Sequence, residues 1–273
     1  MPSSESSPLF AGSIPQFYAQ YLVPILFEPY AADLAARVAV QRPTHVLELA
    51  AGTGVLTRHL AQILPHDVTI VATDLSQPML DQAKTTGASR SVEWRQADAQ
   101  RLPFADQAFD VVVCQFGVMF FPDKVLAFSE ARRVLRPHGQ FIFNVWDRVE
   151  ENEFTDTVLQ AVRPLLSSDG SPFLTRIPHG YADISVIQAD LALAGFTRPP
   201  SVTTVTARSR ADAPHLPAVA LCQGTPMRNE LEAQGPDVLQ IATERASAAM
   251  AARFGTGAVE GQLQALIVVT EAE

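Results

Sequence analysis

Between residues 44 and 146, short and continuously apolar segments alternate with amphipathic ones, and this alternation limits the possible folds more than any other feature. Buried strands are predicted at 44–49, 68–73, 109–114 and 140–146, with a shorter alternating strand at 92–95. Helices are predicted between them at 54–64, from Ser76 onward, and at 123–135. Strands that are apolar on both sides need helices on both faces of a parallel sheet, and right-handed crossovers then produce a doubly wound α/β fold.

The rest of the chain is less regular. After a tail at 1–13, helices are predicted at 14–40, 150–166 and 183–194, and strands at 201–207 and 263–270. The segment between these last strands is too long for a hairpin loop, so we expect a helical insertion with helices near 217–224 and 236–254. The predicted parts are an N-terminal part (1–43), a core (44–207), the insertion (208–262) and a closing strand (263–273).

Composition and charge exclude several classes of protein. The 273 residues are 47% apolar and 18% charged, which is ordinary for one large folded domain and excludes a disordered, collagen-like or coiled-coil chain. Twenty basic and 29 acidic residues give a net charge of −9. A nucleic-acid surface needs a basic stripe, and the chain offers only the pair Arg132–Arg133. We therefore expect no nucleic-acid partner.

Neither a metal site nor a membrane segment is expected. Cys114 and Cys222 are far apart and have no zinc-ligand spacing, and Cys114 ends an apolar run, so a buried free thiol is predicted there. The N-terminal residues 1–8 contain no lysine or arginine and do not resemble a targeting leader. The longest nearly apolar stretch, 111–121, has about half the length of a membrane span. A soluble, cytoplasmic protein is predicted, and a homodimer is compatible with the sequence.

The residues that follow the predicted strands are the candidate binding residues, because ligands of an open parallel sheet bind beyond the carboxyl ends of its strands. Gly52 and Gly54 permit a tight turn after the first strand, at the positive end of the next helix. Asp74 follows the second strand, where a carboxylate can accept from both hydroxyls of a ribose or can serve as a charge at a helix N-terminus. Asp98 and Ala99 follow the third strand, where a carboxylate beside a small residue suits an adenine.

The combination of these motifs resembles the class I S-adenosylmethionine-dependent methyltransferases, close to the branch of the ubiquinone/menaquinone C-methyltransferases. The resemblance covers rather more than a third of the chain and is carried by residues 46–54, 72–76, 97–99, 102–104, 109–110 and 132–137. It implies a seven-stranded, Rossmann-like sheet with an antiparallel final strand, and S-adenosylmethionine as the cofactor. The chain departs from the family at Ala50, where the first loop residue is usually glycine.

The resemblance also implies roles for individual residues. Ala50, Gly52 and Gly54 would lie against the methionine part of the cofactor, Asp74 would hold the ribose, and Leu75 and Met79 would flank the adenine. Asp98 would accept from the adenine amino group beside Ala99, and Gln115 and Phe116 would border the methionine end. Glu48 stands on an otherwise apolar strand, where a charge needs a partner. It would contact the cofactor's ammonium group or accept a buried hydrogen bond from a nearby loop.

Candidate substrate residues are fewer and less specific. In the family the segment before the first strand folds over the cofactor, which makes Tyr18 and Tyr21 candidate lid residues. Phe120 belongs to an aromatic cluster with Phe116 and Phe121, and such a cluster is more typical of a core than of a substrate site. His179 and Tyr181 lie in a loop bounded by proline and glycine, where binding residues are common.

Transfer of a methyl group from S-adenosylmethionine to a small-molecule acceptor is therefore the predicted function, with an oxygen, nitrogen or carbon nucleophile. Such a displacement depends mainly on alignment of the reacting atoms, so no catalytic residue is implied. Methyltransferases that act on exocyclic nitrogens carry an Asn/Asp-Pro-Pro-aromatic stretch after the fourth strand, and residues 115–118 do not match it. A nicotinamide-dependent oxidoreductase is disfavoured because Thr57 replaces the third glycine of the dinucleotide motif. A non-catalytic binding module with the same fold is the remaining alternative.

Overall fold

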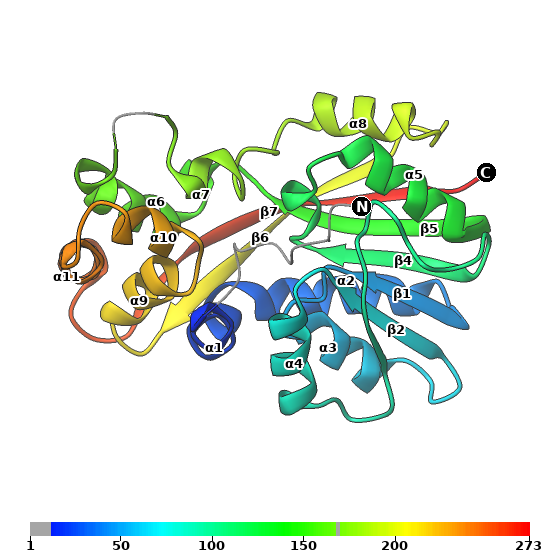
Figure 1. Ribbon diagram of the computed structural model, residues 1–273, viewed down its shortest axis with the longest axis horizontal. Helices are drawn as coiled ribbons and strands as arrows, with labels where there is room; N and C mark the ends of the chain where they lie inside the picture. The colour runs from blue at the N-terminus through cyan, green and yellow to red at the C-terminus, as the bar shows by residue number, and fades with distance from the viewer. Residues whose placement is uncertain (1–11, 168–169) are drawn as a thin grey trace.

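A seven-stranded sheet runs through the centre of the molecule in the order β3-β2-β1-β4-β5-β7-β6, as a computed structural model shows (Figure 1). The structure describes residues 12–167 and 170–273, so the prediction of a tail without a leader at 1–8 falls outside it. The first five strands are parallel and β7 is antiparallel to both of its neighbours. The strands are β1 (His45–Leu49), β2 (Thr69–Asp74), β3 (Glu93–Gln96), β4 (Phe109–Gln115), β5 (Leu135–Trp146), β6 (Ser201–Ala211) and β7 (Val259–Glu271). This is the predicted fold.

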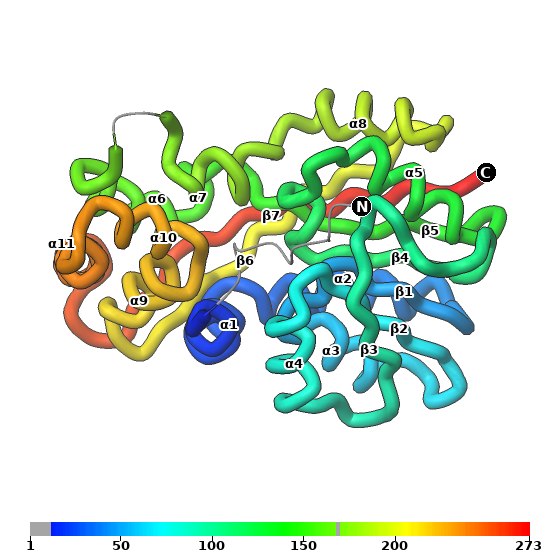
Figure 2. The backbone as a smooth tube through the Cα atoms, in the orientation of Figure 1, coloured from blue at the N-terminus to red at the C-terminus, as the bar shows by residue number. Residues whose placement is uncertain are grey.

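Helices cover both faces of the sheet. The crossover through α3 (Val55–Ile63) leads from β1 to β2, whereas the crossover through α5 (Lys124–Val134) leads from β4 to β5, away from β1 in the opposite direction. Right-handed crossovers in opposite directions put their helices on opposite faces. Figure 2 accordingly shows α3 and α4 (Gln77–Thr86) on one side and α5 and α8 (Ile184–Leu193) on the other. The sheet core is continuously apolar, as in the fully buried strand β4 between Val111 and Cys114.

The last two strands run further than predicted. β6 continues to Ala211 and β7 begins at Val259, so the segment between them is shorter than expected. The added length is stabilised on one face by Arg208 and Arg210, which form ion pairs with Glu260 at 2.7 and 2.6 Å. Three helices rather than two connect the strands and gather at their far end in Figure 1: α9 (His215–Gln223), α10 (Met227–Glu232) and α11 (Val238–Phe254).

The segment predicted as one helix at 150–166 is interrupted. It consists of two 3-10 turns, η4 (Val149–Glu151) and η5 (Arg163–Leu165), that flank the helix α6 (Glu153–Val162), and the short helix α7 (Phe173–Arg176) follows. The buried Asn152 explains the first interruption, because its amide donates to the Asp147 and Arg148 carbonyls and accepts from the Gln264 N–H. A side chain bonded to three backbone groups fixes a turn where the sequence pattern predicts a helix.

The N-terminal segment is helical but unusual. It runs through α1 (Ile14–Phe17), the π-helix η2 (Tyr18–Phe27) and α2 (Glu28–Val40). Pro24 lies inside η2 and has no N–H to donate, which disfavours an ordinary α-helix at this point. The wide turns of η2 bring Tyr18 and Phe27 into a stack with ring centroids 5.1 Å apart, at the carboxyl ends of the central strands.

Candidate functional site

The loops that follow β1, β2, β3 and β4 border a cavity of about 170 Å³, which we call the loop cavity. Nine of the predicted binding residues line it: Ala50, Gly52, Asp74, Leu75, Met79, Asp98, Ala99, Gln115 and Phe116. Tyr18 and Phe120, two of the predicted substrate residues, also reach it. Residues from four separate strand ends therefore lie around one space, as expected where the carboxyl ends of parallel strands meet.

Asp74 ties two of these loops together. Its Oδ2 accepts from the Gly52 N–H at 2.8 Å and its Oδ1 accepts from the Ser76 N–H at 2.7 Å. Burial raises the pKa of Asp74, and the backbone N–H groups of Ser76 and Gly52 counteract this effect. A carboxylate has about four lone-pair sites. Both predicted roles of Asp74 are thus compatible, since two hydrogen bonds to the backbone leave acceptor sites for a ligand in the cavity.

The first loop keeps an unusual backbone. Ala50 has a φ of 51°, a left-handed conformation that costs a residue with a side chain roughly 1–2 kcal/mol. Gly117 makes room for it, because a Cβ at Gly117 would lie 2.5 Å from the Ala50 Cβ. Gly54 also has a positive φ, of 80°, but does not line the loop cavity. The Trp94 ring lies over it, so a Cβ there would be 2.8 Å from that ring.

Glu48 lies beneath the first loop beside a small space of about 20 Å³. It is 1% exposed and its Oε2 accepts from the Thr57 hydroxyl at 2.6 Å. Burial raises the pKa of Glu48 to about 8, although the Thr57 hydrogen bond opposes this. The hydrogen bond to a neighbouring element, one of the two predicted roles, is therefore formed. Thr57 occupies the position where a dinucleotide motif has its third glycine.

Two buried polar atoms beside the same space lack a hydrogen-bond partner among the described residues. They are the Thr53 hydroxyl and the Gln115 Oε1, both of which line it together with Glu48. Orphaned buried polar groups are costly and suggest a ligand or water. Two acceptor side chains and a hydroxyl suit an amino-acid group, because an ammonium donates to Glu48 and Gln115 and a carboxylate accepts from Thr53. The residues present thus fit the methionine part of S-adenosylmethionine.

The wall at the end of β4 is an aromatic stack. Phe116 has a φ of 49°, which is rare for a bulky residue, and its N–H is held by the Asn144 Oδ1 at 2.8 Å. Its ring stacks on Trp146 with centroids 3.7 Å apart, and Tyr30 meets both rings edge-on. Neither Asn144 nor Trp146 was among the predicted site residues. The signal in the sequence is a polar residue in an apolar strand, in register with Gln115.

A second space of about 60 Å³, which we call the aromatic cavity, adjoins the loop cavity and shares Tyr18, Phe116 and Phe120 with it. Its other walls come from η2, the end of β5, α6, α7, the loop with His179, and α9 with the turn that follows it. The lining residues there are Leu22, Leu26, Phe27, Trp146, Thr155, Phe173, Leu174, Pro178, His179, Leu221 and Thr225. No aspartate, glutamate, lysine or arginine is among the described residues that line it.

The remaining two predicted substrate residues lie elsewhere. Tyr21 packs against Phe17 with centroids 5.7 Å apart and borders a separate groove beside β6 and β7. Tyr181 donates a hydrogen bond to Asp190 at 2.6 Å, and the Lys124 ammonium lies 4.9 Å from its ring centroid. Tyr21 does not line either cavity, because it lies on a different side of η2 from Tyr18. Tyr181 instead anchors α8 to its preceding loop.

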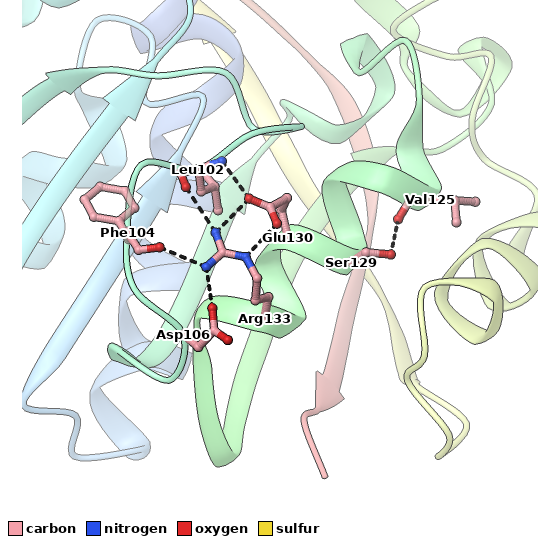
Figure 3. Close-up of polar contacts among 7 residues, drawn as sticks. All are labelled: Leu102, Phe104, Asp106, Val125, Ser129, Glu130 and Arg133. Atoms are coloured by element: carbon pink, nitrogen blue, oxygen red, sulfur yellow. Dashed lines mark hydrogen bonds and ion pairs between the residues drawn. The ribbon is translucent and has the colours of Figure 1, made fainter.

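A network around Arg133 holds the loop that carries Asp98 onward to β4 (Figure 3). The guanidinium donates to the carbonyls of Leu102 and Phe104 at 3.0 and 2.9 Å, and to Asp106 at 2.7 Å. It also forms a two-point ion pair with Glu130 at 2.6 and 2.8 Å, and Glu130 accepts from the Leu102 N–H. One side chain of α5 thereby fixes the loop between β3 and β4.

The family model described as a methyltransferase domain matches residues 47–143, which include the first loop, Asp74, Asp98 and Phe116. This match marks residues 47–143 as a methyltransferase domain. This domain is similar to the ubiquinone/menaquinone biosynthesis C-methyltransferase UbiE of Saccharophagus degradans, with 38% identity over 36% of this chain and 41% of that protein. An uncharacterized protein of Mycobacterium tuberculosis is 33% identical over 50% of this chain and 48% of its own length. The chain thus spans less than half the length of these relatives.

Solved structures show the same fold over most of the chain. A SAM-dependent methyltransferase from Thermotoga maritima matches with a TM-score of 0.55 and 15% identity, covering 96% of this chain and 97% of that one. The cyclase SpnF matches with a TM-score of 0.53 and 17% identity, covering 89% and 80%. The fold alone therefore does not determine the reaction. Within the described residues, no helix could span a membrane and no cluster of potential metal ligands occurs.

Proposed function

We propose that the protein transfers a methyl group from S-adenosylmethionine to a small-molecule acceptor. The observation that carries this proposal is the pair of adjoining cavities, which share Tyr18, Phe116 and Phe120 as a common wall. One cavity is bordered by the loops of the methyltransferase domain. The other is lined mainly by apolar side chains and would lie beyond the methionine end of the bound cofactor. Two reactants bound on either side of one wall would meet there.

The residues of the loop cavity suit the parts of the cofactor. Asp74 would accept from the ribose hydroxyls with its remaining lone pairs, Leu75 and Met79 would pack on the adenine, and Asp98 would accept from the adenine amino group. Glu48, Thr53 and Gln115 would hold the amino-acid end. When bound, S-adenosylmethionine supplies a methyl group on a positively charged sulfur, which is already activated as a leaving group.

The chain's own contribution would be positioning. Reacting atoms held about 3 Å apart and in line gain several kcal/mol without an acid or a base. The fixed backbone of Phe116, held by Asn144 and by the Trp146 stack, provides a rigid wall for this alignment. The aromatic side chains of the shared wall would also exclude water from one side of the sulfonium.

Calorimetric titration tests this proposal. We expect the protein to bind S-adenosylmethionine and its demethylated product S-adenosylhomocysteine. Asp74→Asn should weaken both by roughly tenfold or more, because hydrogen bonds to a charged group contribute about 1.5–3 kcal/mol. Asp67→Asn is the matched control, since Asp67 is exposed just before the other end of β2.

The competing functions predict different binding results in the titrations with NAD and S-adenosylmethionine. Binding of NAD without binding of S-adenosylmethionine would favour the oxidoreductase and would overturn the proposal. Binding of S-adenosylmethionine with no methyl transfer to any compound of a broad metabolite panel would favour the non-catalytic module. The hydroxyl of Thr57 already bonds to Glu48 where a dinucleotide motif needs glycine, which supports the methyltransferase.

A further inference from the structure

His179 is the only ionisable side chain other than tyrosine among the described residues that line the aromatic cavity. The other polar side-chain groups there are hydroxyls and the indole N–H of Trp146, which only donates. The Thr225 hydroxyl already donates to the Leu221 carbonyl at 2.7 Å and accepts from the Met227 N–H. The cavity therefore presents few polar contacts to a ligand, and His179 is the most versatile of them.

One ring nitrogen of His179 has a fixed role. Its Nδ1 lies 2.7 Å from the Asp147 carbonyl oxygen. A carbonyl oxygen only accepts, so Nδ1 carries the proton and Nε2 is left with a lone pair. The described residues provide no hydrogen-bond donor to Nε2.

The backbone around His179 is fixed as well. The His179 N–H donates to the Leu174 carbonyl at 3.1 Å. The next residue must be glycine, because a Cβ at Gly180 would lie 2.3 Å from the Arg176 carbonyl oxygen. The imidazole packs beside Trp146 with centroids 6.0 Å apart. Three contacts therefore fix the position of the imidazole: the backbone hydrogen bond to Leu174, the Nδ1 hydrogen bond to Asp147 and the packing against Trp146.

The surroundings keep the imidazole neutral. Burial lowers the pKa of His179 to about 4, and the Asp147 carbonyl and the charges of Glu150 and Asp147 oppose this only in part. These two carboxylates belong to the turn after β5, and the cavity-lining residues of η2, α6, α7 and α9 contribute no charge. A neutral imidazole at physiological pH retains its Nε2 acceptor.

We propose, resting on the methyltransferase function above, that His179 Nε2 accepts a hydrogen bond from the hydroxyl of an aromatic methyl acceptor bound in the aromatic cavity. The walls favour a flat apolar ring, since they include Phe116, Phe120 and Trp146. A protonated amine is disfavoured, because no carboxylate lines the cavity to compensate a buried ammonium. The substrate class is thus a phenol.

The transfer balances with the groups present. The phenolic oxygen forms a bond to the methyl carbon while the bond between that carbon and sulfur breaks and its electron pair stays on sulfur, which becomes a neutral thioether. The O–H proton passes to His179 Nε2 and then to solvent. A protonated aryl ether is a much stronger acid than an imidazolium, so a weakly basic histidine is sufficient.

The test uses 4-nitrophenol and its methyl ether 4-nitroanisole as probes, titrated into the complex with S-adenosylhomocysteine at about pH 5.5, where 4-nitrophenol keeps its O–H proton and His179 stays neutral. We expect the wild-type protein to bind 4-nitrophenol roughly tenfold more tightly than the ether, which has no donor for Nε2. His179→Asn keeps a donor for the Asp147 carbonyl but lacks the distal acceptor, so this preference should disappear. His179→Gln can present its amide oxygen near the Nε2 position and should restore part of the preference. His66→Asn, on an exposed histidine, is the control.

The transfer rate provides a second readout. In the presence of S-adenosylmethionine, His179→Asn should lower kcat for methylation of 4-nitrophenol by about 100-fold, the usual contribution of a general base, and should leave cofactor affinity unchanged. Equal binding of 4-nitrophenol and 4-nitroanisole to the wild-type complex, or no binding of either, would overturn the proposal, even if no His179 variant folds. Failure to bind S-adenosylhomocysteine at all would instead refute the proposed function itself.

Discussion

At the scale of single residues, Ala50 and Gly117 form a compensating pair. Ala50 retains a left-handed backbone although it has a side chain, and its methyl group occupies the space that a side chain at Gly117 would need. Gly117→Ala would place a Cβ 2.5 Å from the Ala50 Cβ and 2.6 Å from the Cys114 Sγ. We expect it to destabilise the protein by about 1–3 kcal/mol.

Urea unfolding of the Gly117→Ala variant measures this effect. Gly257→Ala is the control, because a Cβ there meets no atom within 4 Å, and its effect should stay within about 0.5 kcal/mol. Equal stability of the two variants would show that the loop accommodates both side chains.

Glu48 makes the stability of the folded protein depend on pH. Burial raises its pKa to about 8, from an ordinary value of 4.5 in an unfolded chain. A proton on Glu48 therefore favours the folded state, and this contribution is complete below about pH 4.5 and is lost as the pH rises through about 8. Without ligand, the protein should lose at least about 1 kcal/mol of stability by this route between pH 5 and 8.

The comparison of wild type with Glu48→Gln isolates that contribution. Free energies of unfolding at several pH values should fall more steeply for the wild type, whereas Glu93→Gln, on an exposed residue of β3, should follow the wild type. Parallel curves for wild type and Glu48→Gln would contradict the raised pKa. Saturating S-adenosylhomocysteine should reduce the difference, because its ammonium would favour the ionised carboxylate.

At the scale of elements, Arg133 connects α5 to the loop between β3 and β4. Lysine cannot replace its planar set of donors, which serves two carbonyls and two carboxylates at once. Arg133→Lys should cost about 1–3 kcal/mol and should increase hydrogen exchange in the segment 102–108. Arg132→Lys is the control on the same helix, since the buried Nε of Arg132 has no hydrogen-bond partner within residues 12–167 and 170–273. Unchanged exchange in Arg133→Lys would show that packing alone holds the loop.

The strands β1, β2 and β4 were predictable because each is a short apolar run that needs only local information, whereas β5 begins at Leu135 rather than at 140. The same applies to the residues at the strand ends, since parallel strands bring their carboxyl ends together in any doubly wound sheet. The extent of β6 and β7 was not predictable. It depends on backbone pairing between residues about 50 positions apart, to which the ion pairs of Arg208 and Arg210 with Glu260 are added.

The parts of the site that the sequence did not reveal depend on contacts between distant elements. Asn144 holds the strained Phe116 backbone from a neighbouring strand, and Thr57 bonds to Glu48 from the following helix. Tyr21 was predicted as a lid residue beside Tyr18, but only the π-helical geometry of η2 decides which of the two faces the cavities. Composition and periodicity contain none of this information.

At the scale of the whole molecule, the two cavities draw on different parts of the chain. The loop cavity is formed largely by the strand ends of the methyltransferase domain, with Tyr18 of η2. The aromatic cavity draws on more of η2, on α6 and α7, and on α9 at the far end of the long β6–β7 pair (Figure 1). This division predicts that cofactor binding and acceptor binding can be changed separately. Two substitutions, one in each cavity, test it.

Ala99→Leu adds bulk to the loop cavity at a half-buried position, and Leu221→Phe adds bulk to the aromatic cavity from α9. Ala99→Leu should weaken S-adenosylhomocysteine by roughly tenfold or more, while Leu221→Phe should change its Kd by less than about threefold yet abolish methyl transfer to 4-nitrophenol. Thermal melting of both variants checks that each is folded. A Leu221→Phe variant that loses cofactor affinity as strongly as Ala99→Leu would mean that the two cavities act as a single site, because the shared wall would then transmit every change in one cavity to the other.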